Sequence, residues 1–224
     1  MTVEELNQKF LDVVEGLKSQ PTGAKTRIVP KLKGVPASEK AAELHSKFIN
    51  DYNLKANFEK LGITYSIAPA LLAGIASRES NMGTTLIKPT SIYWGWGDYG
   101  TRTSRGEKHP TYHGFGVLQL DRIAAPFSAV TTELNRSLGK IKLNPYEERW
   151  LEWGVKTFMN KLDNAGTSYP KLAASEQFAT ALSKYNGGRK GFYYPENDAY
   201  TTGKDYANDT LARARWYANN WSKI

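Results

Sequence analysis

The sequence predicts an α+β fold that is mostly helical and carries one small antiparallel sheet. Several segments repeat apolar residues every three or four positions, which is the spacing of an amphipathic helix. Residues 91–121 are instead rich in glycine, tyrosine and tryptophan with little helical period, a pattern typical of a short twisted sheet and its loops. With 224 residues, 40% of them hydrophobic, the chain is long and apolar enough to bury a sizeable core.

The N-terminal part of the chain predicts a helix followed by an extended connection. Apolar residues recur at helical spacing over residues 2–19, and Thr2 with Glu5 forms a capping-box pattern at the start. Residues 20–37 hold three prolines, two glycines and several lysines, which disfavour regular structure. We therefore expect residues 1–40 to form a helical arm and basic linker, and residues 41–224 to form the main domain.

The main domain is expected to begin with two helices of different character. The first spans about residues 38–61 and ends at Gly62. Its inner side is predicted to consist of Leu44, Phe48, Tyr52 and Leu61. The second spans residues 67–79 and is apolar on nearly all sides, so it should be surrounded by other helices.

The remaining elements are a sheet and three helices. The sheet is expected within residues 91–121, with a long loop at about residues 100–113. The helices are predicted at about residues 145–163, 175–185 and 205–221 from their apolar spacing and start signals.

The net charge of +8 and the absence of cysteine limit what the chain can do. Without cysteine there are no disulfides, iron–sulfur clusters, cysteine nucleophiles or thiolate zinc sites. The positive charge indicates a polyanionic partner, such as nucleic acid, an anionic membrane surface or the acidic polymers of a bacterial wall. No apolar run approaches the roughly 20 residues that cross a bilayer, so membrane insertion is not expected.

Three carboxylic acids carry the strongest functional signal. Glu79 ends the apolar helix, where lost hydration disfavours the charged form, so its pKa is expected to rise. The helix dipole also disfavours an acid at this end, so local stability does not explain its presence. Asp98 and Asp121 lie in glycine-rich turns and are expected to stay ionised. One proton donor facing ionised carboxylates is the arrangement that cleaves a glycosidic bond.

Each of these acids also has a purely structural interpretation. In that interpretation Glu79 pairs with Arg78 or with a distant lysine, because structural ion pairs also perturb pKa values. Asp98 and Asp121 would then only hydrogen-bond their own turns.

Other chemistries find no support in the sequence. The only histidines are His45, His109 and His113, and the pair His109 and His113 lies in a loop rich in glycine, proline and tyrosine instead of on a helix, so a zinc site is not expected. Neither a phosphate-binding glycine loop nor a serine nucleophile elbow occurs. We therefore expect no metal and no cofactor.

Five strings of residues occur in the order in which goose-type lysozymes carry them. They are Ser77–Gly83 (SRESNMG), Gly95–Asp98 (GWGD), Gly114–Asp121 (GFGVLQLD), Tyr185–Gly188 (YNGG) and Thr202–Tyr217 (TGKDYANDTLARARWY). On these strings the chain resembles the goose-type lysozymes, and the resemblance covers roughly residues 45–221. That family lies within the larger superfamily that includes the bacterial lytic transglycosylases.

The resemblance implies a lysozyme-like fold with the sheet beside an active-site cleft. It implies hydrolysis of the β-1,4 bond between N-acetylmuramic acid and N-acetylglucosamine in peptidoglycan, by an inverting mechanism and with antibacterial effect. Glu79 falls on the family's general acid, and Asp98 and Asp121 fall on the aspartates that position and activate the attacking water. The positions that line the sugar-binding groove correspond to Gln119, Tyr185, Asn186 and Tyr206. We expect a monomer that acts on peptidoglycan and not on nucleic acid.

Three alternatives to a muramidase stay open. A lytic transglycosylase uses the same glutamate but replaces water by the sugar's own 6-hydroxyl, and generally lacks aspartates such as Asp98 and Asp121. A chitinase on the same fold would cleave a different polymer. A cationic wall-binding protein without activity would explain the charge of +8 equally well.

The resemblance leaves two segments and the location unexplained. Residues 100–113 are longer than the usual link between the two aspartate motifs, and residues 1–40 have no counterpart in the family. The opening MTVEELNQKF has acidic and amide residues where a signal peptide has a basic start and an apolar centre. We expect action on bacteria outside the cell, with cytoplasmic storage as the alternative.

Overall fold

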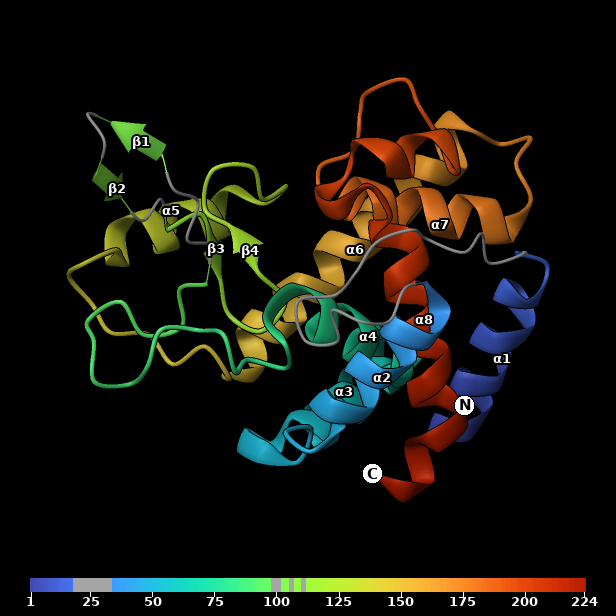
Figure 1. The fold of residues 1–224 in the computed structure, drawn as a ribbon, viewed down its shortest axis with the longest axis horizontal. Helices are drawn as coiled ribbons and strands as arrows, with labels where there is room; N and C mark the ends of the chain where they lie inside the picture. The colour runs from blue at the N-terminus through green and yellow to red at the C-terminus, as the bar shows by residue number, and fades with distance from the viewer. Residues whose placement is uncertain (18–33, 98–101, 105–106, 110–111) are drawn as a thin grey trace.

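The computed structural model describes residues 1–17, 34–97, 102–104, 107–109 and 112–224 (Figure 1). The α-helices are α1 (Val3–Glu15), α2 (Val35–Ser46), α3 (Leu54–Tyr65), α4 (Pro69–Ser80), α5 (Ser128–Ser137), α6 (Glu148–Ser168), α7 (Ala174–Tyr185) and α8 (Tyr206–Asn220). The strands are β1 (Arg102–Ser104), β2 (Glu107–His109), β3 (Gly114–Phe115) and β4 (Leu120–Asp121). Short 3₁₀ helices are η1 (Asp51–Asn53), η2 (Glu196–Tyr200), η3 (Thr202–Lys204) and η4 (Trp221–Lys223). The predicted mostly helical α+β class is confirmed.

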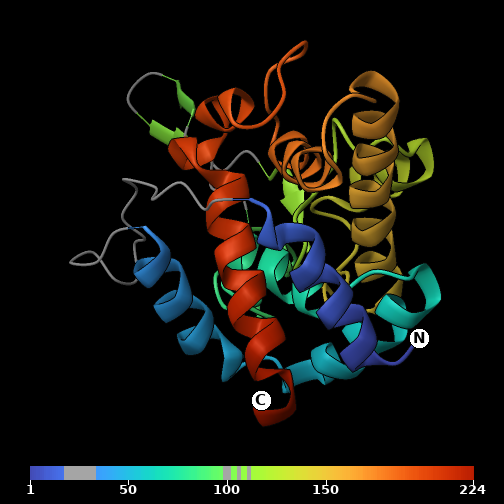
Figure 2. The same ribbon diagram turned by 90° about the vertical axis from the view of Figure 1, so that its right-hand side faces the viewer.

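Helix α4 lies at the centre of the helical part and packs against α1, α2, α3 and α8 (Figures 1 and 2). Every residue from Pro69 to Ser77 is buried, as expected for a helix that is apolar on nearly all sides. Helix α8 approaches it closely: a Cβ added to Gly74 would lie 2.8 Å from Cβ of Ala214. Glycine at this position therefore lets the two helix backbones approach.

Helix α1 belongs to the same core. The predicted capping box is present, since the Thr2 hydroxyl accepts from the Glu5 backbone and the Glu5 carboxylate accepts from the Thr2 backbone. Its apolar side chains Phe10 and Val14 are buried against the main cluster. Asn7 Oδ1 also accepts a hydrogen bond of 3.1 Å from the Ala70 backbone at the start of α4. Most of the predicted linker, residues 20–37, lies outside the described residues, and the domain boundary at residue 40 stays a prediction.

The single helix predicted over residues 38–61 is wrong. Helix α2 ends at Ser46, and α3 begins at Leu54. Between them Tyr52 and Asn53 have φ angles of 54° and 60°, which a right-handed helix does not contain. Phe48 and Tyr52 are 38% and 54% exposed, so they do not lie on an inner side.

Gly62 does not end a helix either. It lies inside α3, where an added Cβ would be 2.6 Å from Cγ of Pro69. Its role is therefore to let α3 pack closely on the start of α4. The helix ends instead at Ser66, whose φ of 53° is left-handed.

The second part of the molecule contains the strands and α5. Strand β3 pairs antiparallel with β4, with Gly114 opposite Asp121. The segment predicted as a long loop contains a second antiparallel pair, β1 with β2, with Thr103 opposite Lys108. Helix α5, which the sequence analysis did not predict, contributes Val130 to a separate buried cluster.

Helix α6 connects the two parts, and Figure 1 shows it running between them. Trp150 belongs to the cluster beneath the strands, whereas Val155 and Phe158 belong to the main helical core. None of the helices in the described ranges is long and apolar enough to cross a membrane.

Candidate active site

Glu79 is the penultimate residue of the buried helix α4 and is itself half-buried. The helix ends directly after it, because Asn81 adopts a left-handed φ of 49° and its N–H binds the Ala76 carbonyl. The carboxyl group thus lies at the C-terminal end of a helix, where the dipole disfavours negative charge. The ionised form of Glu79 must therefore be stabilised by residues of other helices or loops.

Tyr206, the first residue of α8, provides that contact. Its hydroxyl donates a hydrogen bond of 2.6 Å to Glu79 Oε1. Burial and the charge of Glu79 hold the pKa of Tyr206 well above its usual range, so the phenol stays protonated and remains a donor. The predicted groove residue Tyr206 therefore contacts the predicted acid directly.

Arg78 links the end of α4 to α8 and to the loop that precedes α8. Its Nε lies 2.8 Å from Asp209 Oδ2, and its Nη2 donates a hydrogen bond of 2.8 Å to the Thr202 carbonyl. The guanidinium carbon also lies 5.4 Å from the centre of the Tyr206 ring, within cation–π range. Arg78 pairs with Asp209, and this pair holds the Tyr206 ring in place over the end of α4.

A buried polar cluster continues behind Arg78. Arg213 Nε lies 3.0 Å from Asp209 Oδ1, and Arg213 Nη1 donates to the Ser77 hydroxyl at 2.9 Å. His45 Nδ1 lies 2.7 Å from the same hydroxyl oxygen. Burial raises the pKa of Asp209, but the Arg213 and Arg78 guanidiniums overcome this effect and hold it below its usual range. One carboxylate thus pairs with two cations, the buried Arg213 and the half-buried Arg78, beneath the turn that carries Glu79.

Tyr185 and Asn186, at the end of α7, connect this region to its neighbours. The Tyr185 hydroxyl donates a hydrogen bond of 2.7 Å to the Leu118 carbonyl, just before β4. Burial, and then the charge of Glu79, raise the pKa of Tyr185 well above its usual range. Asn186 Oδ1 accepts a hydrogen bond of 2.8 Å from the Thr202 backbone. The two residues therefore link the strand side of the site to the loop that Arg78 holds.

Asp121 ends β4 and is half-buried. Its Oδ1 accepts hydrogen bonds from the backbone N–H groups of Ile123 at 2.7 Å and Ala124 at 3.1 Å. Asp121 therefore hydrogen-bonds its own turn, as its purely structural interpretation predicts. These bonds also fix the carboxylate in one orientation. Among the described residues we find no hydrogen bond to Oδ2.

Gln119 belongs to the string that carries Asp121 and contacts the string that carries Asp98. Its Nε2 donates a hydrogen bond of 2.7 Å to the Gly116 carbonyl, and the residue itself has a φ of 49°. A Cβ added to Gly97 would lie 2.6 Å from the Gln119 amide, so this contact requires glycine. Asp98 follows Gly97 directly but lies outside the described residues, so its place in the site stays a prediction.

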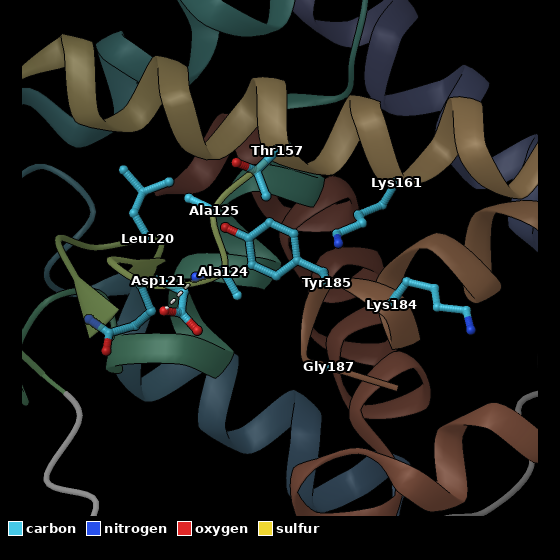
Figure 3. Close-up of a pocket in the computed structure, with 10 residues that line it drawn as sticks. Leu120, Asp121, Ala124, Ala125, Thr157, Lys161, Lys184, Tyr185 and Gly187 are labelled. Atoms are coloured by element: carbon cyan, nitrogen blue, oxygen red, sulfur yellow. Dashed lines mark hydrogen bonds between the residues drawn. The ribbon is translucent and has the colours of Figure 1, made fainter. Parts of the chain in front are cut away.

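A pocket of about 200 Å³ opens beside these residues (Figure 3). It is lined by Gln119, Leu120, Asp121, Ala124, Ala125, Thr157, Lys161, Lys184, Tyr185 and Gly187. In Figure 3, Asp121 lies on one side of the Tyr185 ring and the two lysines lie on the other. The sequence analysis identified the acidic side of this pocket but not the two lysines, which stand in no motif.

Carboxylates and histidines of the described ranges do not gather into a group of three or more that could hold a metal ion. The arrangement that remains is a hydrogen-bonded glutamic acid, an oriented aspartate and a pocket lined by this aspartate and Tyr185. These are groups for proton transfer and for binding a polyhydroxylated substrate.

Comparisons with known proteins agree with this chemistry. A family model described as Lysozyme g matches residues 16–221, so the expectation that residues 1–40 have no counterpart in the family is wrong for residues 16–40. The chain is 32% identical to lysozyme g of Takifugu rubripes over 188 residues, which are 84% of this chain and 84% of that protein. It is 31% identical to lysozyme g of Struthio camelus, over 82% of this chain and 74% of that protein. From its sequence and from this extent of similarity, the chain belongs to the lysozyme g family and is a glycosidase.

Proposed function

We propose that the chain hydrolyses the β-1,4 bond between N-acetylmuramic acid and N-acetylglucosamine in bacterial peptidoglycan, with Glu79 as the general acid. The observation that carries this proposal is the 2.6 Å hydrogen bond from Tyr206 to the half-buried Glu79 carboxyl. A carboxyl group held in this way is oriented for proton transfer. Once it has given up its proton, the carboxylate is stabilised by the Tyr206 hydroxyl, which already donates to it. Membership of the lysozyme g family supports the same assignment.

In the proposed reaction Glu79 gives its proton to the glycosidic oxygen as the bond from this oxygen to the anomeric carbon breaks. A water molecule attacks that carbon from the opposite face, and its proton passes to an aspartate, so the configuration inverts. Asp121 and Asp98 are proposed to take this proton and to orient the water. Such a pair of acid and base stands about 6.5–9.5 Å apart, which leaves room for the water.

The groove for the sugar chain is proposed to be lined by Gln119, Tyr185, Asn186 and Tyr206. Gln119 and Tyr185 line the pocket beside Asp121. Tyr206 contacts the acid, and Asn186 holds the neighbouring Thr202 backbone. We further propose a monomer that kills bacteria outside the cell, without nucleic acid or a membrane as partner.

The test of this proposal is the substitution Glu79→Gln, which removes the transferable proton and keeps the shape of the side chain. We expect hydrolysis of peptidoglycan to fall by about 10²–10⁴-fold, the usual contribution of a positioned general acid. Glu43→Gln is the matched control, because Glu43 is exposed on α2 and pairs only with Lys40 among the described residues. Equal activity of the Glu79→Gln variant and the parent would refute the assignment.

The products separate the proposed reaction from its alternatives. Hydrolysis with inversion gives the α-anomer first, which nuclear magnetic resonance of a fresh digest detects. Anhydro-muramyl ends in the mass spectrum would instead identify a lytic transglycosylase. Faster turnover of chitin oligomers than of peptidoglycan would identify a chitinase, and binding without any product would identify a non-catalytic wall-binding protein.

A further inference from the structure

The pocket beside Asp121 has a basic side that the proposed reaction does not use. Lys161 comes from α6 and Lys184 from α7, and both line the pocket. In Figure 3 both lie on the side of the Tyr185 ring that faces away from Asp121, with the Lys161 ammonium directed toward the ring and the Lys184 ammonium directed away from it. The pocket therefore has an acidic side next to the proposed chemistry and a basic side beyond the ring.

The two lysines lie close enough to affect each other. Burial, and then the positive charge of Lys161, lower the pKa of Lys184. The Lys184 ammonium donates a hydrogen bond to the Arg189 carbonyl, which holds it at the end of α7. A carbonyl oxygen accepts this hydrogen bond but does not cancel the charge.

Neither ammonium group is neutralised within the part of the chain that the structure describes. No carboxylate of these residues lies within 4.0 Å of Lys161 or Lys184, whereas Lys156, one turn earlier on α6, pairs with Glu152 at 2.9 Å. Asp163 is two residues after Lys161 on the same helix and is exposed, and residues two apart on a helix do not face each other. Two uncompensated like charges at one side of a pocket disfavour the folded state, and an anionic ligand would relieve their repulsion.

We propose that Lys161 and Lys184 form a subsite that binds a carboxylate of the peptide branch carried by muramic acid. This inference rests on the proposed function and adds to it the part of the substrate that lies beyond the sugar chain. A sugar held at the Tyr185 ring would have its reactive bond toward Asp121 and Glu79. Its acidic branch would then reach toward the lysines on the other side of the ring. The subsite selects for peptidoglycan over a neutral polymer of N-acetylglucosamine.

The test couples a change in the protein to a change in the ligand. The protein variants are Lys161→Gln, the conservative Lys161→Arg, and Lys9→Gln as a control that removes one positive charge from the exposed surface of α1. The substrates are soluble peptidoglycan strands with free peptide carboxylates and the same strands after amidation of these carboxylates. The quantity measured is kcat/KM.

We expect amidation to lower kcat/KM of the parent by about tenfold, since one charge-assisted hydrogen bond contributes on this scale. On the free strands, kcat/KM of Lys161→Gln should be about tenfold lower than that of the parent. Amidation should not lower kcat/KM of this variant further, because the interaction between the lysine and the carboxylate is already absent. Lys161→Arg and Lys9→Gln should keep the full response to amidation.

Two results would overturn the subsite. One is an equal loss in Lys161→Gln and Lys9→Gln, which would mean that only the total charge matters. The other is a full response to amidation in Lys161→Gln. Strands stripped of their peptides by an amidase keep the free lactyl carboxylate. If amidation still lowers kcat/KM of the parent on these strands, and Lys161→Gln still abolishes this effect, the assignment to the peptide branch is overturned.

Failure of the proposed function gives a different signature. If the parent hydrolyses neither kind of strand, the reaction is wrong, and the subsite is then tested by binding alone. Calorimetric titration with a soluble disaccharide–peptide should give a Kd about tenfold weaker for Lys161→Gln than for the parent and for Lys9→Gln. Equal Kd values in all three proteins would reject the subsite independently of catalysis.

Discussion

The Tyr206 hydroxyl and the Glu79 carboxyl form a hydrogen bond of 2.6 Å between residues that lie 127 positions apart in the chain. The contact joins the last turn of α4 to the first residue of α8. It places a neutral donor against a carboxyl group that the α4 dipole does not favour. The donor favours the ionised form of the acid, which is the form that appears when the acid has given up its proton.

The first prediction concerns this donor. We expect Tyr206→Phe to lower kcat/KM by roughly 10- to 100-fold, because a hydrogen bond to a charged group contributes about 1.5–3 kcal/mol. The basic limb of the pH–rate profile should also move to higher pH, because the ionised acid has lost its donor and keeps its proton longer. The measurement is the pH dependence of kcat/KM on peptidoglycan strands.

Tyr194→Phe is the matched control for this prediction. Tyr194 is also buried, and its hydroxyl donates to Asn208 Oδ1 of α8 at 2.8 Å instead of to Glu79. It should therefore affect stability but leave the position of the basic limb unchanged. Identical profiles for the two phenylalanine variants would mean that the Tyr206 hydroxyl does not act on the acid.

The second prediction concerns Asp209, which neutralises Arg78 and Arg213 behind the site. We expect Asp209→Asn to lower the free energy of unfolding by about 3–5 kcal/mol, because it leaves the buried Arg213 guanidinium without its ion-pair partner. Glu148→Gln breaks the exposed pair with Lys60 and should cost less than about 1 kcal/mol. Urea denaturation of both variants measures the difference, and equal costs would contradict the proposed role of Asp209.

The parts of the fold that the sequence predicted well are those whose signal is local. The apolar run of α4 and the polar pair Thr2 and Glu5 are each contained in one turn or one helix, so their structure follows from neighbouring residues. The break at Tyr52 is different, because residues 38–61 keep a helical period throughout. There the Tyr52 ring stacks on Tyr146, 3.9 Å between ring centres, and this contact comes from a distant part of the chain.

The candidate site divides in the same way. Glu79 and Asp121 were found from the strings around them, and Tyr185 and Tyr206 from the resemblance. The sequence suggests Arg78 only as a partner for Glu79, whereas in the structure Arg78 of α4 pairs with Asp209 of α8. The sequence does not predict the basic side of the pocket, because its lysines come from two helices and only the packing of these helices places both at the pocket.

The third prediction concerns the contact between α4 and α8. Gly74→Ala adds a Cβ that would lie 2.8 Å from Cβ of Ala214, so the helices must separate. We expect a loss of about 1–3 kcal/mol in the free energy of unfolding, as for other overpacked cores. Activity should fall as well, because separation of the helices lengthens the bond from Tyr206 to Glu79.

Gly166→Ala in α6 is the control for this substitution. The nearest atom to its added Cβ is Gln177 Oε1 at 3.5 Å, an ordinary contact distance. Alanine has the higher helix propensity, so this variant should gain up to about 1 kcal/mol. Thermal denaturation of both variants separates the packing effect from the propensity effect, and equal signs would contradict the close approach at Gly74.

The last prediction concerns His45, which is buried against Ser77 and Arg213. Burial, and then the charge of Arg213, lower its pKa from 6.5 to about 4. In the unfolded chain the ring takes up a proton as the pH falls below about 6.5, whereas in the folded protein it does so only near pH 4. The folded state should therefore lose about 3 kcal/mol from this residue between about pH 6.5 and pH 4.

The measurement is the free energy of unfolding in urea at several pH values for the parent and for His45→Gln. The parent should lose more stability than the variant across this interval, and below about pH 4 the two curves should run parallel because both states of the parent are then protonated. His113→Gln replaces a half-buried histidine near β3 and should leave the difference in place. Parallel curves for the parent and His45→Gln from pH 7 to pH 4 would mean that the ring takes up its proton at the same pH in the folded protein as in the unfolded chain, and that Asp209 must then balance three cations instead of two at the lower pH values.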